Sequence, residues 1–315
     1  MRQIEIVGMR KDRDLKIVIT IIILAIISII VCVGLILYNR YNRAESVETV
    51  AGLEDPSNQN SAMVGSDEDG KKENVDELED DSESEQEEGI GENKNDEKAQ
   101  EFIDKINNIY NGEEGKRVFL TFDDGPTQEV TPHILDILDK YNIKATFFVL
   151  GNRVEMNPDL LKREYESGHY IANHGYSHKY SKIYKSATSV LSEYNKTEKA
   201  IQEALGNPNY SSNLFRFPGG SHGGPYEKIK KKARTTLNEN GIAYLDWSAL
   251  TYDAEGADTK KEILSNLKKT INGWDNVVIL MHDSADKQIT YETLEDVIKY
   301  LQGEGYAFKN IYDLI

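Results

Sequence analysis

From residue 117 to the C-terminus, short apolar runs alternate with stretches of helical periodicity. Alternating strands and helices are typical of a parallel sheet covered by its own helices. The number of repeats predicts a distorted seven-stranded β/α barrel, smaller than the usual eightfold one, with any active site at the carboxyl ends of the strands. The candidate strands are Val118–Phe122, Thr146–Leu150, Tyr170–Ala172, Phe215–Phe217, Ala243–Trp247, Val277–Met281 and Tyr306–Phe308.

Residues 17–38 are apolar and carry no charge. A helix needs roughly 20 such residues to cross a bilayer core. A buried core helix would normally have a polar face, and a cleavable signal would have a shorter apolar region that ends at small residues. A lipoprotein signal at Cys32 also fits poorly, because Ile30 and Val31 precede that cysteine. We therefore predict a single, uncleaved transmembrane helix.

Charge around this segment predicts its orientation. Five basic residues precede it, whereas only Arg40 and Arg43 follow it closely. Because basic residues gather on the cytoplasmic side of a membrane, residues 1–16 should form a cytoplasmic tail. The rest of the chain should then lie outside the cell, attached to the cell membrane by one span.

The stretch after the anchor is strongly acidic. Residues 44–100 carry twenty acidic and four basic side chains and few aromatics, a composition that cannot bury enough apolar area to fold. We predict a disordered acidic linker over residues 39–100, a lead-in helix over 101–116 and a folded domain over 117–315. The chain has no basic patch with interleaved aromatics, so we expect no nucleic-acid partner, and no protein partner is identifiable from the linker.

Polar side chains follow two of the predicted strands. Asp123 and Asp124 come at the end of the first strand, and His174 and His178 follow the third. Two imidazoles and a carboxylate suit a divalent metal and leave one position open for water. Taken singly, the aspartates also fit an ordinary turn, and the histidines also fit a chance pair on the surface.

Later strand ends carry further candidates. Arg216 could pair with a carboxylate of the first motif, and His282, at the tip of a buried strand, is placed for acid–base work. Asp253 could hydrogen-bond a histidine and raise its pKa, while Gly219 would let a backbone N–H approach a ligand closely. Each also has a structural explanation: a surface ion pair, a buried structural histidine or a plain loop aspartate.

In combination, these motifs resemble the polysaccharide deacetylase family, the NodB-homology domain of carbohydrate esterase family four, over residues 117–315. The resemblance is carried by Thr121-Phe122-Asp123-Asp124-Gly125-Pro126, by Ala145-Thr146-Phe147-Phe148, and by the later His-x-x-x-His, Arg, Asp and His. It implies a NodB-like barrel, in agreement with the strand count. It also implies metal-dependent hydrolysis that removes acetyl groups from N-acetylated sugars and releases acetate.

The resemblance also implies a role for each matching residue. The expected ligands of a divalent metal, usually zinc, are Asp124, His174 and His178. The expected catalytic groups are the base Asp123, its partner Arg216, the general acid His282 and the tuning residue Asp253, for which Asp246 is a rival. The expected substrate-binding residues are Gly219, whose N–H would join an oxyanion hole, Leu280, which would line the acetyl pocket, and Trp247.

Two departures from the family pattern bear on the substrate. Arg216-Phe217-Pro218-Gly219-Gly220-Ser221 replaces the common Arg-x-Pro-Tyr and resembles the membrane-anchored peptidoglycan deacetylases. Ala254 stands where many members have a tryptophan that forms one wall of the substrate groove. The predicted anchor and the Gly219-Gly220 variant together predict peptidoglycan glycan strands as the substrate. Chitin oligomers, acetylated xylan and a non-catalytic role in binding wall carbohydrate stay as alternatives.

Overall fold

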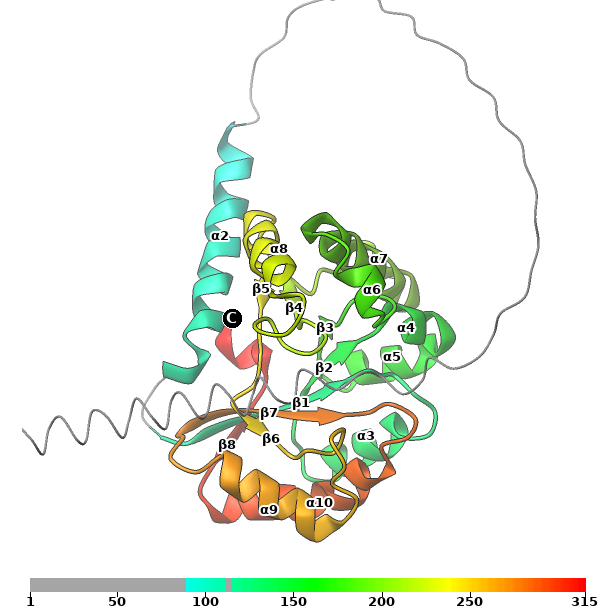
Figure 1. The fold of residues 1–315 in the computed structure, drawn as a ribbon, viewed down its shortest axis with the longest axis vertical. Helices are drawn as coiled ribbons and strands as arrows, with labels where there is room; N and C mark the ends of the chain where they lie inside the picture. Colours follow the sequence, from blue (N-terminus) through cyan, green and yellow to red (C-terminus); the bar gives the residue numbers. More distant parts are fainter. Residues whose placement is uncertain (1–88, 112–114) are drawn as a thin grey trace, which may run out of the picture. The chain divides into compact units, whose positions relative to one another are not determined.

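The computed structural model describes residues 89–111 and 115–315 (Figure 1). The predicted cytoplasmic tail, the predicted membrane anchor and most of the predicted linker lie outside these residues. Within the described ranges, no helix combines the length and the apolar character needed to cross a bilayer.

Seven parallel strands form a curled sheet in the order β5-β4-β3-β2-β1-β7-β6, and β8 pairs with β1 beside this path (Figure 1). The strands are β1 (Arg117–Asp123), β2 (Thr146–Val149), β3 (Tyr170–Asn173), β4 (Leu214–Phe215), β5 (Ala243–Tyr244), β6 (Ala249–Leu250), β7 (Asn276–His282) and β8 (Ala307–Lys309). Because the path of paired strands ends at β5 on one side and at β6 on the other, the predicted distorted seven-stranded barrel is an open, curled half-barrel.

The predicted count of seven matches the path, but one member differs. The C-terminal strand β8 lies off the path, and β6 completes it although it was not predicted. A two-residue strand is too short to show the alternation by which strands are recognised. Strands β4 and β5 also end earlier than predicted. Beyond β5, the carbonyl groups of Leu245 and Asp246 accept hydrogen bonds from Arg216.

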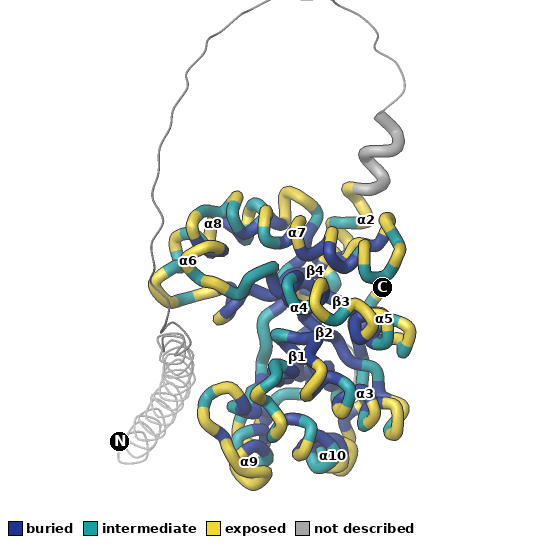
Figure 2. The backbone as a smooth tube through the Cα atoms, turned by 90° about the vertical axis from the view of Figure 1, so that its right-hand side faces the viewer, coloured by how far each residue is buried: buried dark blue, intermediate teal, exposed yellow. Residues whose placement is uncertain are grey.

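Helices flank this sheet on both sides of β1 (Figure 1). They are α2 (Gly89–Asn107), α3 (Thr131–Lys140), α4 (Gly151–Met156), α5 (Pro158–Glu166), α6 (Tyr180–Ile183), α7 (Ala187–Leu205), α8 (Glu227–Glu239), α9 (Lys260–Thr270) and α10 (Gln288–Gly303), with short 3-10 turns η1 (Ile109–Asn111) and η2 (Ile311–Leu314). Helices α3, α9 and α10 lie beside β1 and β7, whereas α4 to α8 accompany β2 to β5. Buried residues concentrate on β1 to β4 (Figure 2).

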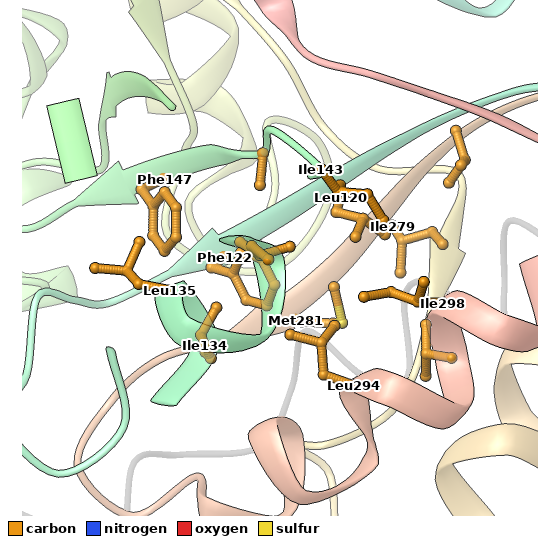
Figure 3. Packing of buried hydrophobic residues seen from close by; sticks show 14 of the residues in the cluster. Leu120, Phe122, Ile134, Leu135, Ile143, Phe147, Ile279, Met281, Leu294 and Ile298 are labelled. Atoms are coloured by element: carbon orange, nitrogen blue, oxygen red, sulfur yellow. The ribbon is translucent and has the colours of Figure 1, made fainter. Parts of the chain in front are cut away.

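Strand β1 shows how the sequence builds both the core and the site. Val118, Leu120 and Phe122 belong to a hydrophobic cluster packed against α3 and α10 (Figure 3). Alternate side chains of a strand point to opposite faces, so Thr121 and Asp123 share the other, inner face of the sheet. One seven-residue strand therefore anchors the outer core and delivers a buried carboxylate to the interior of the half-barrel.

Helix α2 corrects the predicted domain boundary. It begins at Gly89, inside the segment predicted to be disordered, and the predicted lead-in helix over 101–116 therefore starts earlier. Ile103 and Ile106 are buried in the inner hydrophobic cluster together with Phe119 of β1. Most helical stability in proteins comes from packing of this kind rather than from local composition. This packing accounts for the part of α2 inside the predicted range, and the helix ends at Asn107 rather than at residue 116.

Candidate active site

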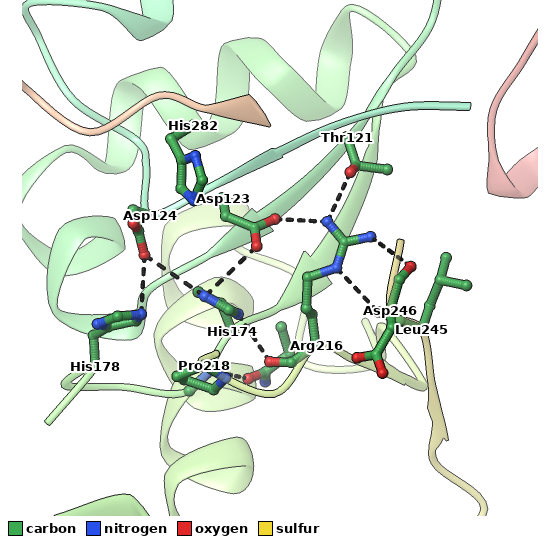
Figure 4. Close-up of polar contacts among 12 residues, drawn as sticks. Thr121, Asp123, Asp124, His174, His178, Arg216, Pro218, Leu245, Asp246 and His282 are labelled. Atoms are coloured by element: carbon green, nitrogen blue, oxygen red, sulfur yellow. Dashed lines mark hydrogen bonds and ion pairs between the residues drawn. The ribbon is translucent and has the colours of Figure 1, made fainter. Parts of the chain in front are cut away.

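The three predicted metal ligands converge at the carboxyl ends of β1 and β3 (Figure 4). Asp124 Oδ1 lies 3.6 Å from His174 Nε2 and 3.5 Å from His178 Nε2. Ligand atoms about 2.1 Å from a tetrahedral zinc ion lie about 3.4 Å apart from one another. Within the described part of the chain, Asp124 Oδ1 is buried without a hydrogen-bond donor. The three side chains therefore fit a divalent cation.

Backbone strain marks two of these three residues. Asp124 has φ 80° and His178 has φ 54°, both in the left-handed region. Residues other than glycine pay a conformational cost there, and such strain clusters at functional sites. The surrounding structure must therefore hold both ligands in place.

His174 is held as a neutral imidazole. Its Nδ1 lies 2.8 Å from the carbonyl oxygen of Arg216. Because a carbonyl can only accept, Nδ1 carries the proton and Nε2 keeps its lone pair on the side of Asp124. Burial lowers the pKa of His174 to about 3 and outweighs the opposing charge of Asp124. An imidazole in this state is suited to bind a metal ion.

Asp123 forms a buried ion pair with Arg216. Arg216 Nη1 donates to Asp123 Oδ1 at 2.8 Å and to Thr121 Oγ1 at 2.7 Å, and Nε donates to the Leu245 carbonyl at 3.0 Å. The guanidinium is fully buried and stacks over the Phe148 ring. Burial raises the pKa of Asp123 more than the Arg216 charge lowers it. Asp123 is therefore fixed in place and more basic than an exposed aspartate.

His282, at the end of β7, is bound by Asp253. Its Nδ1 lies 3.0 Å from Asp253 Oδ1, while Asp253 Oδ2 accepts from the His282 N–H and from Thr290 Oγ1, each at 2.7 Å. Burial alone would lower the pKa of His282, but the charge and hydrogen bond of Asp253, with help from Asp124 and Asp123, raise it to about 10. The rival Asp246 accepts instead from Ser221, so Asp253 is the partner of His282.

Each predicted substrate-binding residue lies beside another residue of the site. Gly219 has φ 69°, which residues with a side chain rarely adopt, and a Cβ there would lie 2.5 Å from the Tyr180 hydroxyl, which would have to move. Leu280 is buried on β7 two residues before His282, and the two therefore share one face of the strand. The Trp247 ring centroid lies 5.8 Å from the Arg216 guanidinium carbon, which places Trp247 against the ion pair with Asp123.

Sequence reasoning missed Thr121 and Tyr180. Thr121 accepts from Arg216, and it was detectable because it lies two residues before Asp123 and hence on the same strand face. Tyr180 lies beside Gly219, and its ring centroid is 5.7 Å from that of His178. No local pattern marks Tyr180, because its neighbours come from separate loops.

Comparisons with known proteins agree with this geometry. A family model described as polysaccharide deacetylase matches residues 110–245. A peptidoglycan-N-acetylglucosamine deacetylase of Listeria monocytogenes is 34% identical over 67% of this chain, and the match spans 41% of that protein. One of Bacillus cereus is 32% identical over 65% of this chain and 72% of its own length. The solved structure of a Streptococcus mutans CE4 esterase has a TM-score of 0.60 at 32% identity and covers 66% of this chain and 90% of the esterase.

Proposed function

This chain belongs to the polysaccharide deacetylase family of hydrolytic enzymes, and we propose that it is a metal-dependent deacetylase of bacterial peptidoglycan. The observation that carries the proposal is one constellation: a three-residue metal site, a buried carboxylate and a histidine raised in pKa meet at the carboxyl ends of β1, β3 and β7. Each of these groups has a place in the hydrolysis of an amide.

The metal site supplies the electrophilic half of the chemistry. Asp124, His174 and His178 would hold the cation, and two imidazoles with one carboxylate are a donor set suited to zinc. When bound, such a cation would polarise the acetyl carbonyl and make water a better nucleophile at neutral pH.

Asp123 would act as the base. Its Oδ1 accepts from Arg216, which leaves Oδ2 to take the proton of the attacking water. The buried pair with Arg216 fixes the direction of that oxygen, and the raised pKa of Asp123 strengthens it as a proton acceptor. We expect Asp123 to be needed for turnover and not for metal binding.

His282 would act as the acid. An amine leaves poorly unless it is protonated, so the departing sugar nitrogen needs a proton donor. Because Asp253 holds Nδ1, the proton would come from Nε2. A pKa of about 10 keeps His282 charged at neutral pH. A bound cation would offset part of the charge of Asp124 and Asp123 and so bring this pKa closer to neutrality.

The substrate pocket would complete the reaction. The N–H of Gly219 would stabilise the oxyanion that forms on the acetyl oxygen, a donor often worth about 3–4 kcal/mol. Leu280, on the His282 face of β7, would line the pocket for the acetyl methyl group. The names of the Listeria and Bacillus relatives support N-acetylglucosamine, rather than N-acetylmuramic acid, as the sugar attacked.

The proposed location is the outer face of the cell membrane. The uncharged run over residues 17–38 and the basic residues before it support a single-pass anchor with a cytoplasmic N-terminus and an extracellular catalytic domain. The acidic stretch after the anchor would let the domain reach the wall. Protease treatment of intact cells should remove the domain and leave residues 1–16 protected. Protection of the domain would contradict this location.

The test of the activity is acetate release by the full chain from peptidoglycan, chitin oligomers and acetylated xylan, with zinc supplied. Mass spectra of the muropeptides identify the sugar in which hydrogen has replaced an acetyl group. Asp123→Asn is the matched control and should retain zinc while losing about 10³-fold or more in kcat. Acetate release from xylan alone would contradict peptidoglycan as the substrate. Binding of glycan strands without acetate release would contradict the proposed hydrolytic activity.

A further inference from the structure

Asp283 is a buried carboxylate next to His282 that the proposed reaction does not use. It is 1% exposed, and it lies beside the turn that follows β1. Its main-chain N–H donates to the carbonyl of Asp123 at 2.9 Å, and its own carbonyl accepts from Thr127 Oγ1 at 2.7 Å. The backbone of Asp283 therefore binds the turn both before and after Asp124.

The Asp283 side chain adds a further connection. Thr131 Oγ1, at the start of α3, donates to Asp283 Oδ2 at 2.6 Å and accepts from the N–H of Thr127 at 2.8 Å. Within the described residues, Asp283 Oδ1 is buried without a hydrogen-bond donor. The Asp283 carboxylate thus joins the end of β7 to the start of α3 and, through Thr131, to Thr127 in the turn that follows β1.

Gly125 shows how closely the carboxylate fits the turn. A Cβ at Gly125 would overlap the Asp283 carboxylate. The φ angle of Gly125 is not in the left-handed region, so φ does not itself require glycine there. The Asp283 carboxylate leaves no room for a side chain at this position.

The residue between these contacts is Asp124, a predicted metal ligand at φ 80°. A strained conformation persists only where the surrounding structure holds it. The contacts of Asp283 lie on Asp123, Gly125, Thr127 and Thr131, on both sides of Asp124. The same group is covalently next to His282, so it also links the acid to the metal side of the site.

We propose that Asp283 is a positioning residue, a clasp that fixes Asp124 in its ligating conformation and holds the Asp123–Asp124 turn in register with His282. This inference rests on the proposed function in one respect, namely that the bound metal takes part in the reaction. Its direct consequence is for metal affinity and coordination geometry, which can be measured without any turnover.

The experiment uses the full chain and two readouts of the site: competitive zinc titration and the visible spectrum of the cobalt(II) form, which reports ligand geometry. Asp283→Asn should weaken zinc binding by about 10–100-fold, as loss of a group that orients a ligand typically does, and should change the cobalt spectrum. Thr131→Val should act in the same direction and less strongly. Thr293→Val is the matched control for Thr131→Val: it removes the hydroxyl of a buried threonine on α10 that has no hydrogen-bond partner among the described residues, and it should change neither readout.

A double-mutant cycle separates a clasp from general destabilisation. Gly125→Ala should weaken zinc binding about as much as Asp283→Asn. In an Asp283→Ala background the added methyl group has room, so the second change should cost little. Additive losses of affinity would overturn the proposal, as would wild-type zinc affinity and cobalt spectrum in both Asp283→Asn and Gly125→Ala.

Two controls complete the design. Thermal melting tests whether each variant is folded, and if Asp283→Asn does not fold, Thr131→Val and Gly125→Ala decide the question. Acetate release by the wild-type chain tests the proposed function separately. A wild-type protein that binds zinc but releases no acetate would contradict the proposed function. The positioning role of Asp283 would still be decided by zinc affinity and the cobalt spectrum.

Discussion

His174 and His282 are two largely buried histidines of one site with opposite charge states. The pKa of His174 is lowered to about 3 and that of His282 is raised to about 10. Both are desolvated, which disfavours the charged ring. The difference lies in the atom that faces Nδ1, which is a backbone carbonyl of Arg216 for His174 and a carboxylate oxygen of Asp253 for His282.

This contrast divides the site into a proposed metal side and a proposed acid side. On the metal side, formed at β1, β3 and β4, a neutral imidazole keeps a lone pair for a cation. On the acid side, beside β6 and β7, a charged imidazole keeps a proton for a leaving amine. Groups whose environments push their pKa values apart can serve in opposite roles at one pH.

The largest effect should come from the metal side. His174→Ala removes a ligand, and we expect zinc affinity to fall by more than about 100-fold, since even substitutions behind a ligand cost about 10–100-fold. Acetate release should disappear together with the metal. The checks are zinc content after dialysis and the rate with excess zinc. His133→Ala on α3 is the control. A His174→Ala protein with full zinc content would show that His174 does not hold the metal.

His282→Asn should lower turnover without lowering zinc affinity. It leaves Asp124, His174 and His178 in place, so zinc should bind as in the wild type. Loss of the acid should lower kcat by about 10²–10⁴-fold. Parallel zinc titration and steady-state kinetics measure both quantities. Loss of zinc together with activity would assign His282 to the metal side.

Asp253→Asn should change the pH dependence. The rate falls as pH rises through the pKa of the acid, because His282 must arrive protonated. Removal of the Asp253 charge lowers that pKa, so the alkaline limb of the kcat profile should move to lower pH by about one pH unit or more. Zinc affinity should stay the same. If the alkaline limb of the kcat profile stays at the wild-type pH, Asp253 does not set the charge of His282.

Thr290→Val should have the smallest effect. It removes one hydrogen bond to Asp253 Oδ2 and leaves the carboxylate paired with His282. A single hydrogen bond of this kind is worth about 1–2 kcal/mol, so we expect kcat to fall by about five- to thirtyfold. A loss equal to that of Asp253→Asn would mean that Thr290 orients the whole pair.

Much of the site could be predicted because of how parallel sheets are built. The carboxyl ends of parallel strands meet on one side, so polar residues that follow apolar runs gather there. Asp123, Asp124, His174 and His282 were found in this way. Asp283 was not, although it also follows β7, because its significance depends on contacts with Thr131 and Gly125 that local sequence does not reveal.

The strand-and-helix alternation and the residue types at the strand ends could be read from the sequence, because both are local patterns. Tertiary contacts decide that Asp253 and not Asp246 pairs with His282, that β6 completes the half-barrel, and that Ile103 and Ile106 of α2 enter the inner cluster. Each of these depends on the path of a loop or on packing against distant residues. Such contacts form between segments far apart in the chain, and no local period or composition records them.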